Sequence, residues 1–96
     1  MSLIKMSFED VRQKASEYST ASSEIEALLA RLEGYQSELS AVWEGSSFQQ
    51  FDSRFEELKP QIRNFENLLM NISEFLNSAA GTLEEADAAI ANATKY

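Results

Sequence analysis

Carboxylates and hydroxyls are the side chains of this sequence that could perform chemistry, because it contains sixteen Asp and Glu residues but no His and no Cys. The chain therefore lacks the usual general base near neutral pH, a thiol nucleophile, and imidazole or thiolate metal ligands. Adjacent acids such as Glu56-Glu57 and Glu84-Glu85 point in different directions on a helix, which makes them poor acid/base pairs. No glycine-rich phosphate loop is present. The sequence predicts a protein that is not an enzyme and holds no metal or cofactor.

The net charge of −8 limits the partners that this chain can have. A strongly acidic protein repels phosphate backbones and anionic membrane surfaces, so we expect no nucleic-acid binding and no stable membrane insertion. No segment approaches transmembrane length, and Met1 to Ser7 has too short an apolar run for a signal peptide. If the protein is secreted, we expect export without a cleavable signal peptide, with the protein cytoplasmic before export.

Trp43-Glu44-Gly45 lies near the middle of the chain, between two long stretches with helical periodicity. With three Gly and one Pro in 96 residues, the composition favours an all-α fold. Gly45 can adopt the positive φ of a helix C-cap, and Trp43 can either plug the end of a helical bundle or stay partly exposed. A structural corner and a contact site for a partner are therefore both open readings of this motif.

The first helix is predicted at about residues 8–42. Ser7 supplies an N-cap hydroxyl and Asp10 a carboxylate three residues later. The periodic positions that follow alternate steps of four and three and include two polar members, Ser22 and Gln36. A second line, one position earlier, is formed by Ala21, Leu28, Tyr35 and Val42. It makes the apolar stripe wider than one neighbouring helix needs, which predicts a second neighbour.

The second helix is predicted at about residues 47–80, with an apolar residue at every position of the same alternation. The phase continues unchanged through Pro60, which predicts a bend there rather than an end. Aromatic residues at helical spacing could line a ligand groove, but core packing is the favoured reading. We expect a dimer or core stripe on the two helices from Leu28, Leu32, Leu39, Phe48, Phe51, Phe55, Leu58, Ile62, Phe65 and Leu69.

Residues 1–96 are thus predicted to form a single antiparallel helix-turn-helix domain with its bend at 43–46. Folding at the bend leaves residues from about 82 to 96 without an intrachain partner. Gly81, followed by a possible capping sequence, predicts a flexible or separately helical tail over that range. Because a thin two-helix rod buries little surface, a partner subunit is expected.

The central Trp43-x-Gly45, the two amphipathic stretches and the start Ile4-Lys5-Met6-Ser7 resemble the WXG family, which is early-secreted-antigen-like and exported by type VII secretion. The resemblance covers essentially the whole chain. Together with Ser46-Ser47-Phe48 after the corner, it looks most like the homodimeric branch of Gram-positive bacteria.

The resemblance implies an elongated antiparallel four-helix bundle, formed by a homodimer or by a heterodimer with a related WXG chain. It also implies recognition by a membrane-bound secretion ATPase. In the family, a C-terminal Tyr-x-x-x-Asp/Glu lies near the bend of the other subunit and completes the export signal. Leu83 and Asp87 stand at those two positions, so the acid is retained but the aromatic residue is replaced.

Two functions are weighed from the sequence. The favoured one is a small secreted dimeric protein of type VII secretion that acts as an effector, carrier or adaptor in virulence or interbacterial interaction. The alternative is a cytosolic helical chaperone or adaptor that holds a partner protein through its apolar face.

Overall fold

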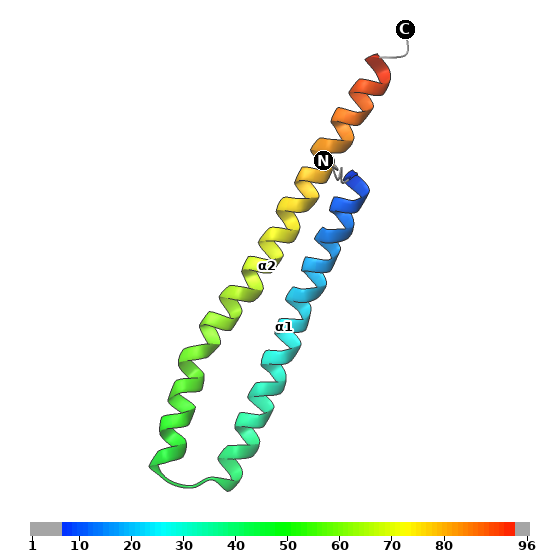
Figure 1. Cartoon of the computed structure of the whole chain (residues 1–96). Helices are drawn as coiled ribbons and strands as arrows, with labels where there is room; N and C mark the ends of the chain where they lie inside the picture. Colours follow the sequence, from blue (N-terminus) through cyan, green and yellow to red (C-terminus); the bar gives the residue numbers. More distant parts are fainter. Residues whose placement is uncertain (1–6, 94–96) are drawn as a thin grey trace, which may run out of the picture.

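Two long antiparallel helices make up the computed structural model, which describes residues 7–93 (Figure 1). Helix α1 spans Phe8–Val42 and helix α2 spans Ser46–Ala93. The molecule measures 79 × 27 × 17 Å along its principal axes, and no strand occurs among residues 7–93. The predicted all-α hairpin is confirmed, and its shape is that of a rod.

Helix α1 begins with the predicted capping box. The backbone N–H of Asp10 donates to the Ser7 hydroxyl at 3.2 Å, and the Asp10 carboxylate accepts from the Ser7 backbone N–H at 3.1 Å. These two bonds satisfy donors that would otherwise be orphaned at the helix start. Residues Ile4 to Met6, which contribute to the family resemblance, lie outside the described residues.

Helix α2 continues through both positions that could interrupt it. Pro60 lies inside the helix, as predicted. At Gly81, however, the helix does not break: it runs on to Ala93, beyond the predicted end near residue 80, and over residues 82–93 it is continuous with the rest of α2. Gly81 is not among the residues with positive φ, and Gly inside a helix costs only about 1 kcal/mol relative to Ala. The alanine-rich sequence after Gly81 offsets that cost, because Ala is the strongest helix former.

A line of mostly small or polar residues forms the seam between the helices. The buried residues of α1 stand seven positions apart, at Ala15, Ser22, Leu29 and Gln36. The two buried residues of α2, Ser73 and Ala80, are also seven apart. Leu29, which is 4% exposed, is the one large apolar side chain buried among the described residues. The hairpin therefore has a close-packed seam but no large apolar core of its own.

Hydrogen bonds across this seam set the register of the two helices. The Ser73 hydroxyl donates to the Ala15 carbonyl oxygen at 2.7 Å, and the Ser22 hydroxyl donates to the Glu66 carbonyl oxygen at 3.0 Å. These contacts are one heptad apart on both helices, which is the geometry of a regular antiparallel pair.

The hairpin is wider at its bend than at its open end (Figure 1). Near the open end, a short serine side chain reaches the backbone of the opposite helix. Near the bend, the same gap is spanned by two side chains together, where the Gln36 amide nitrogen donates to the Asp52 carboxylate. The seam thus tapers from close contact at Ala15 to a wider spacing at Gln36.

Candidate functional site

The bend is a short connection with one residue at positive φ. Trp43 has extended backbone angles, φ −111° and ψ 106°, and its N–H closes α1 by donating to the Leu39 carbonyl oxygen at 2.8 Å. Gly45 has φ +107° and is the positive-φ residue within the described chain. Because residues with a β-carbon rarely adopt this angle, Gly45 is what lets the chain reverse within three residues.

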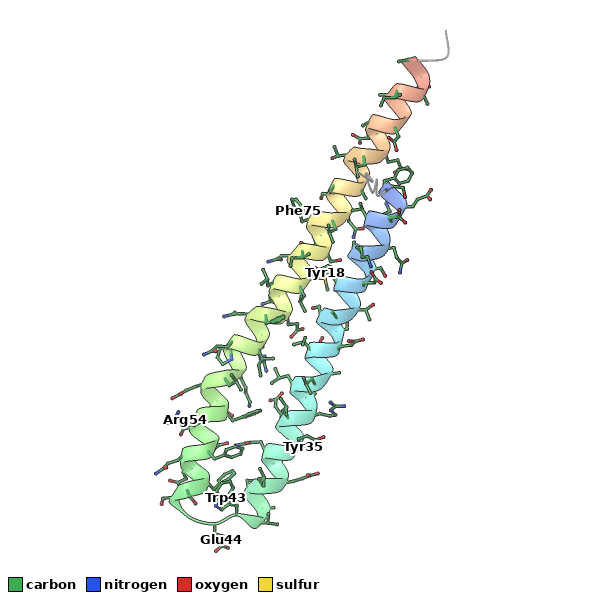
Figure 2. The ribbon with its side chains drawn as sticks, viewed as in Figure 1. Tyr18, Tyr35, Trp43, Glu44, Arg54 and Phe75 are labelled. Atoms are coloured by element: carbon green, nitrogen blue, oxygen red, sulfur yellow. The ribbon has the colours of Figure 1, made fainter. Side chains whose placement is uncertain are left out.

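Trp43 packs against the first turns of α2. Its ring stacks on Phe51 with centroids 5.5 Å apart and meets Phe48 in an edge-to-face contact at 5.7 Å. The indole N–H donates to the Ser47 hydroxyl at 3.0 Å. Glu44, by contrast, points away from the hairpin, as Figure 2 shows. Trp43 is half-buried, so it supports the corner and still offers part of its ring to a partner.

The ten residues predicted for the dimer or core stripe lie on the two helices, and none of them is buried in the single chain. Leu28, Leu58 and Phe65 are 38%, 45% and 47% exposed. Grooves between the helices run along this surface, one of them with a volume of about 280 Å³ and lined mainly by Ile25, Leu28, Leu32, Ile62 and Phe65. We call this surface the apolar face: it comprises the predicted stripe and the flanking residues Tyr18, Ala21, Ile25, Tyr35, Val42, Leu68, Ile72 and Phe75.

Four flanking members of the apolar face are more exposed than these stripe residues: Tyr35, Val42, Leu68 and Phe75. Tyr35 is 52% exposed, Leu68 56%, and Phe75 71%. Figure 2 shows Phe75 pointing away from α1, so its own hairpin cannot cover it. The stripe is wider than one neighbouring helix can cover, which is why it predicted a second neighbour. In the single chain, the extra apolar surface is exposed.

The opposite side of the hairpin is polar. Lys59 bridges the helices there, with ion pairs to Glu56 at 2.9 Å and to Glu33 on α1 at 3.2 Å. A hydrogen bond to Glu56 raises the pKa of Lys59 above its ordinary value of 10.5, and a hydrogen bond to Glu33 adds to the rise, which desolvation partly opposes. We call this side the polar face; a hollow in it is lined by Glu26, Leu29, Ala30, Glu33, Arg63, Glu66 and Asn67.

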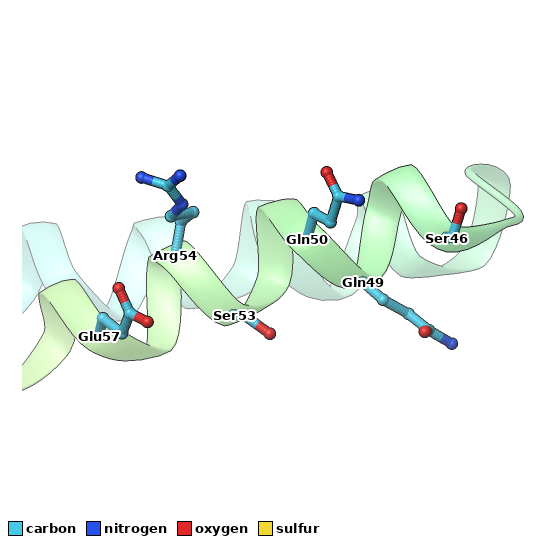
Figure 3. A pocket seen from close by; sticks show the side chains of 6 residues that line it. All are labelled: Ser46, Gln49, Gln50, Ser53, Arg54 and Glu57. Carbon is cyan, nitrogen blue, oxygen red and sulfur yellow. The ribbon is translucent and has the colours of Figure 1, made fainter.

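A polar depression beside the start of α2 does not form a binding site. Figure 3 shows its lining residues, which all come from one helix and include Gln49, Gln50 and Arg54. Their side chains spread outward along the helix instead of converging on a common point. No group of acids in the described residues is arranged to hold a metal ion, and neither helix described is long and apolar enough to cross a membrane.

Leu83 and Asp87 occupy the part of α2 that projects past the start of α1 (Figure 1). Both are exposed, Leu83 by 40%, and they stand four residues apart, which places them on the same side of the helix. An ion pair of 2.7 Å between Arg12 and Glu84 joins the beginning of this projection to α1. Within one hairpin the structure separates these residues from Trp43 and Gly45, which lie at the other end of the rod.

The seam residues of α2 are what the sequence reasoning missed. Ser73 and Ala80 were not assigned to any stripe, since each stands one position after an apolar stripe residue. A signal was present, because they continue a heptad line from Asp52 through Lys59 and Glu66. This line carries the cross-helix contacts of Asp52, Lys59, Glu66 and Ser73.

The fold and the corner together define an elongated helical-hairpin protein with a Trp-x-Gly bend and an open apolar face. Residues 3–88 match the family described as "WXG100: Proteins of 100 residues with WXG". The chain belongs to this WXG100 family, and as a helical hairpin of that family it is not an enzyme.

The relatives agree with this assignment. The chain is 38% identical over 92 residues to the protein named "Type VII secretion system extracellular protein A" of Staphylococcus aureus strain USA300, covering 96% of this chain and 95% of that protein. Its fold is similar to that of EsxA from Geobacillus thermodenitrificans, with a TM-score of 0.86 and 31% identity over 95% of this chain and 100% of that chain. It is also similar to the secreted protein EsxB of Bacillus anthracis, with a TM-score of 0.81 and 26% identity over 91% of this chain and 99% of that chain.

Proposed function

We propose that this protein is a type VII secretion substrate, exported without a cleavable signal peptide as a folded dimer. Two copies pack their apolar faces together as an elongated antiparallel four-helix bundle. The bend and the projecting end of α2 are then presented to a membrane-bound secretion ATPase. After export the dimer acts as a carrier, adaptor or effector between cells. The observation that carries the proposal is the combination of an uncovered apolar face with a Trp-x-Gly corner, in a chain similar to a named extracellular secretion protein.

The amount of exposed surface supports self-association. The chain exposes 7507 Å², whereas a compact monomer of 10.8 kDa exposes about 5,500 Å². The excess of about 2,000 Å² includes the effect of the elongated shape, and it is of the size that one subunit contributes to a large homodimer interface.

The taper of the hairpin supports an antiparallel arrangement. The wide end at the bend of one copy lies beside the narrow open end of the other, which gives the bundle an even thickness. This arrangement also brings Trp43 and Gly45 of one subunit toward Leu83 and Asp87 of the other. The two halves of the export signal, which one hairpin keeps apart, meet only in the dimer.

An export assay with paired variants tests this proposal. We expect Trp43→Ala and Asp87→Asn to reduce the amount of protein in the medium, measured by immunoblot of cells and medium from a strain with an intact secretion system. The matched control is Glu85→Gln, which removes a neighbouring charge from the same projecting segment and should leave export unchanged. Circular dichroism of each purified variant checks that helicity is retained.

The same experiment distinguishes the secretion substrate from the alternative function, a cytosolic chaperone or adaptor. The exposed apolar face could equally hold another helical protein, and a heterodimer with a related chain is one form of that arrangement. Wild-type protein confined to cells that secrete their other type VII substrates would reject export and favour the cytosolic role. Loss of export on deletion of the secretion ATPase supports the substrate reading.

A further inference from the structure

Three residues one heptad apart on α1 form a self-complementary pattern on the apolar face: Ala21, Leu28 and Tyr35. Tyr35 is 52% exposed and Leu28 38% exposed, while the small Ala21 is half-buried. The small and the large residue are each seven positions from Leu28. If two α1 helices pack antiparallel about a two-fold axis at Leu28, residue 21 of each copy faces residue 35 of the other.

The surface over Ala21 is hollowed. A depression of about 160 Å³ is lined by Glu17, Tyr18, Ala21 and Leu69. It adjoins a larger groove of about 720 Å³, which includes Ala21, Leu28 and Phe65 in its lining. A tyrosine ring entering this depression would meet apolar walls, with the Glu17 carboxylate at the rim within reach of its hydroxyl.

We propose that the chain recognises a second copy of itself by reciprocal insertion of Tyr35 into the hollow over Ala21, with Leu28 on the two-fold axis. The inference rests on the self-association proposed above and adds the residues that fix its register. Knob-into-hole packing of this kind favours one register, because a shift of one turn places the ring over a larger side chain.

Charges at the edge of the same groove fit this register. Arg31 and Glu24 both line the groove, three residues after and four residues before Leu28. In the antiparallel pair, residue 31 of each copy lies opposite residue 25 of the other, one position from Glu24. Arg31 and Glu24 are therefore neighbours across the interface, which gives two opposite-charge contacts. Glu17 and Glu38 approach each other in the same way, and Lys14, ion-paired with Glu17 at 2.9 Å, compensates for that like-charge contact.

Helix α2 has a matching centre. Its line on the apolar face consists of Phe51, Leu58, Phe65 and Ile72, with its midpoint between Leu58 and Phe65. The contacts Ser22–Glu66 and Gln36–Asp52 place this midpoint close to the level of Leu28. The same two-fold axis therefore sets Phe65 of each copy against Leu58 of the other.

Complementary variants test the register directly. Tyr35→Ala removes both knobs of the dimer, and Ala21→Tyr fills both hollows so that two rings collide at each contact. Each variant alone should weaken dimerisation by about 100-fold or more, because two symmetric contacts worth about tenfold each are lost together. Mixed in equal amounts, the two variants should form a tight heterodimer, since every contact then pairs one ring with one small residue.

The outcomes separate the register from self-association itself, measured by sedimentation velocity with one variant fluorescently labelled. A dimeric wild type whose mixed variants bind no better than either variant alone would overturn the register but leave the dimer. A monomeric wild type would overturn self-association altogether. A heterodimer as tight as the wild-type dimer supports the proposal.

Disulfide trapping in the otherwise native chain provides a second test, because the sequence has no cysteine. Leu28→Cys should give an intermolecular disulfide under mild oxidation, since residues at the two-fold axis face their own counterparts. A register displaced by one turn would carry the Cα atoms beyond the roughly 7 Å that a disulfide allows. Ala30→Cys, on the polar face, is the control and should stay uncrosslinked; crosslinking of Ala30→Cys instead of Leu28→Cys would contradict the proposal.

Discussion

Trp43 has its one polar side-chain atom satisfied within the corner, because the indole N–H donates to the Ser47 hydroxyl. Its ring also contacts Phe48 and Phe51. The residue is therefore part of the hairpin's structure whether or not a secretion component touches it. The sequence left open whether the corner is structural or a contact site for a partner. The buried part of the Trp43 side chain fits the first role and its exposed part fits the second.

Two truncations separate packing from hydrogen bonding at the corner. Trp43→Ala should lower the free energy of unfolding by about 1–3 kcal/mol, below the usual cost for a fully buried Trp because the ring is half-buried. Ser47→Ala removes only the acceptor of the indole N–H and should cost less than about 1 kcal/mol, since water can replace it. Urea unfolding followed by circular dichroism measures both; an equal loss in the two variants would contradict the packing role.

Lys59 gives the polar face a defined pH dependence. Its pKa is raised in the folded chain, first by the hydrogen bond to Glu56, so its stabilising contribution is present below pH 10.5 and is lost as the pH rises through the folded-state pKa. The difference in melting temperature between wild type and Lys59→Gln should therefore be constant from neutral pH to about pH 9.5 and shrink at higher pH. A difference that grows in alkali would show that Lys59 is not stabilised by these carboxylates.

At the scale of the helices, the two glycines at the bend and in α2 have opposite roles. Gly45 has φ +107°, whereas Gly81 lies inside α2 with nothing within 4 Å of the position that a β-carbon would take. Gly81→Ala should stabilise the protein by up to about 1 kcal/mol. Gly45→Ala should destabilise it by about 1–2 kcal/mol, because an L-residue is strained at that angle.

Thermal unfolding of the two variants is the measurement. A loss of stability in Gly81→Ala would indicate that Gly81 does end the helix, as the sequence first suggested. An unchanged Gly45→Ala would indicate that the bend does not depend on positive φ.

The helices and the bend could be predicted from the sequence because they follow from apolar periodicity and from the cap at Ser7. The part of the seam that lies on α2 could not be predicted in the same way. Ser73 and Ala80 are small, and small or polar residues leave no mark in an apolar pattern, although they let two helices approach closely. The end of α2 was also misplaced, because Gly81 in a sequence has no φ angle, and only the backbone shows that it stays helical.

Part of the candidate site could likewise be predicted from the sequence, and part could not. Trp43 and Gly45 could be located from the motif alone, and the apolar face from the width of the stripes. That Leu83 and Asp87 lie far from the bend within one chain could be seen only in the structure. The contact between Arg12 and Glu84 had no sequence signal, because exposed charges are frequent along both helices.

At the scale of the whole molecule, the two sides of the hairpin should respond differently to a polar substitution. Phe65 on the apolar face is 47% exposed, and Met70 on the other side of α2 is 38% exposed. Phe65→Gln should weaken dimerisation by more than about tenfold, whereas Met70→Gln should leave it unchanged, because only Phe65 is covered by the second copy. Isothermal dilution calorimetry gives both dissociation constants; equal effects would mean that the apolar face is not the interface.

The mass of the wild-type protein in solution is the most direct test of the central claim that this hairpin covers its apolar face with a second copy. Sedimentation equilibrium at micromolar concentration should give the mass of two 10.8 kDa chains. A stable species with the mass of one chain, at concentrations up to the millimolar range, would contradict the account.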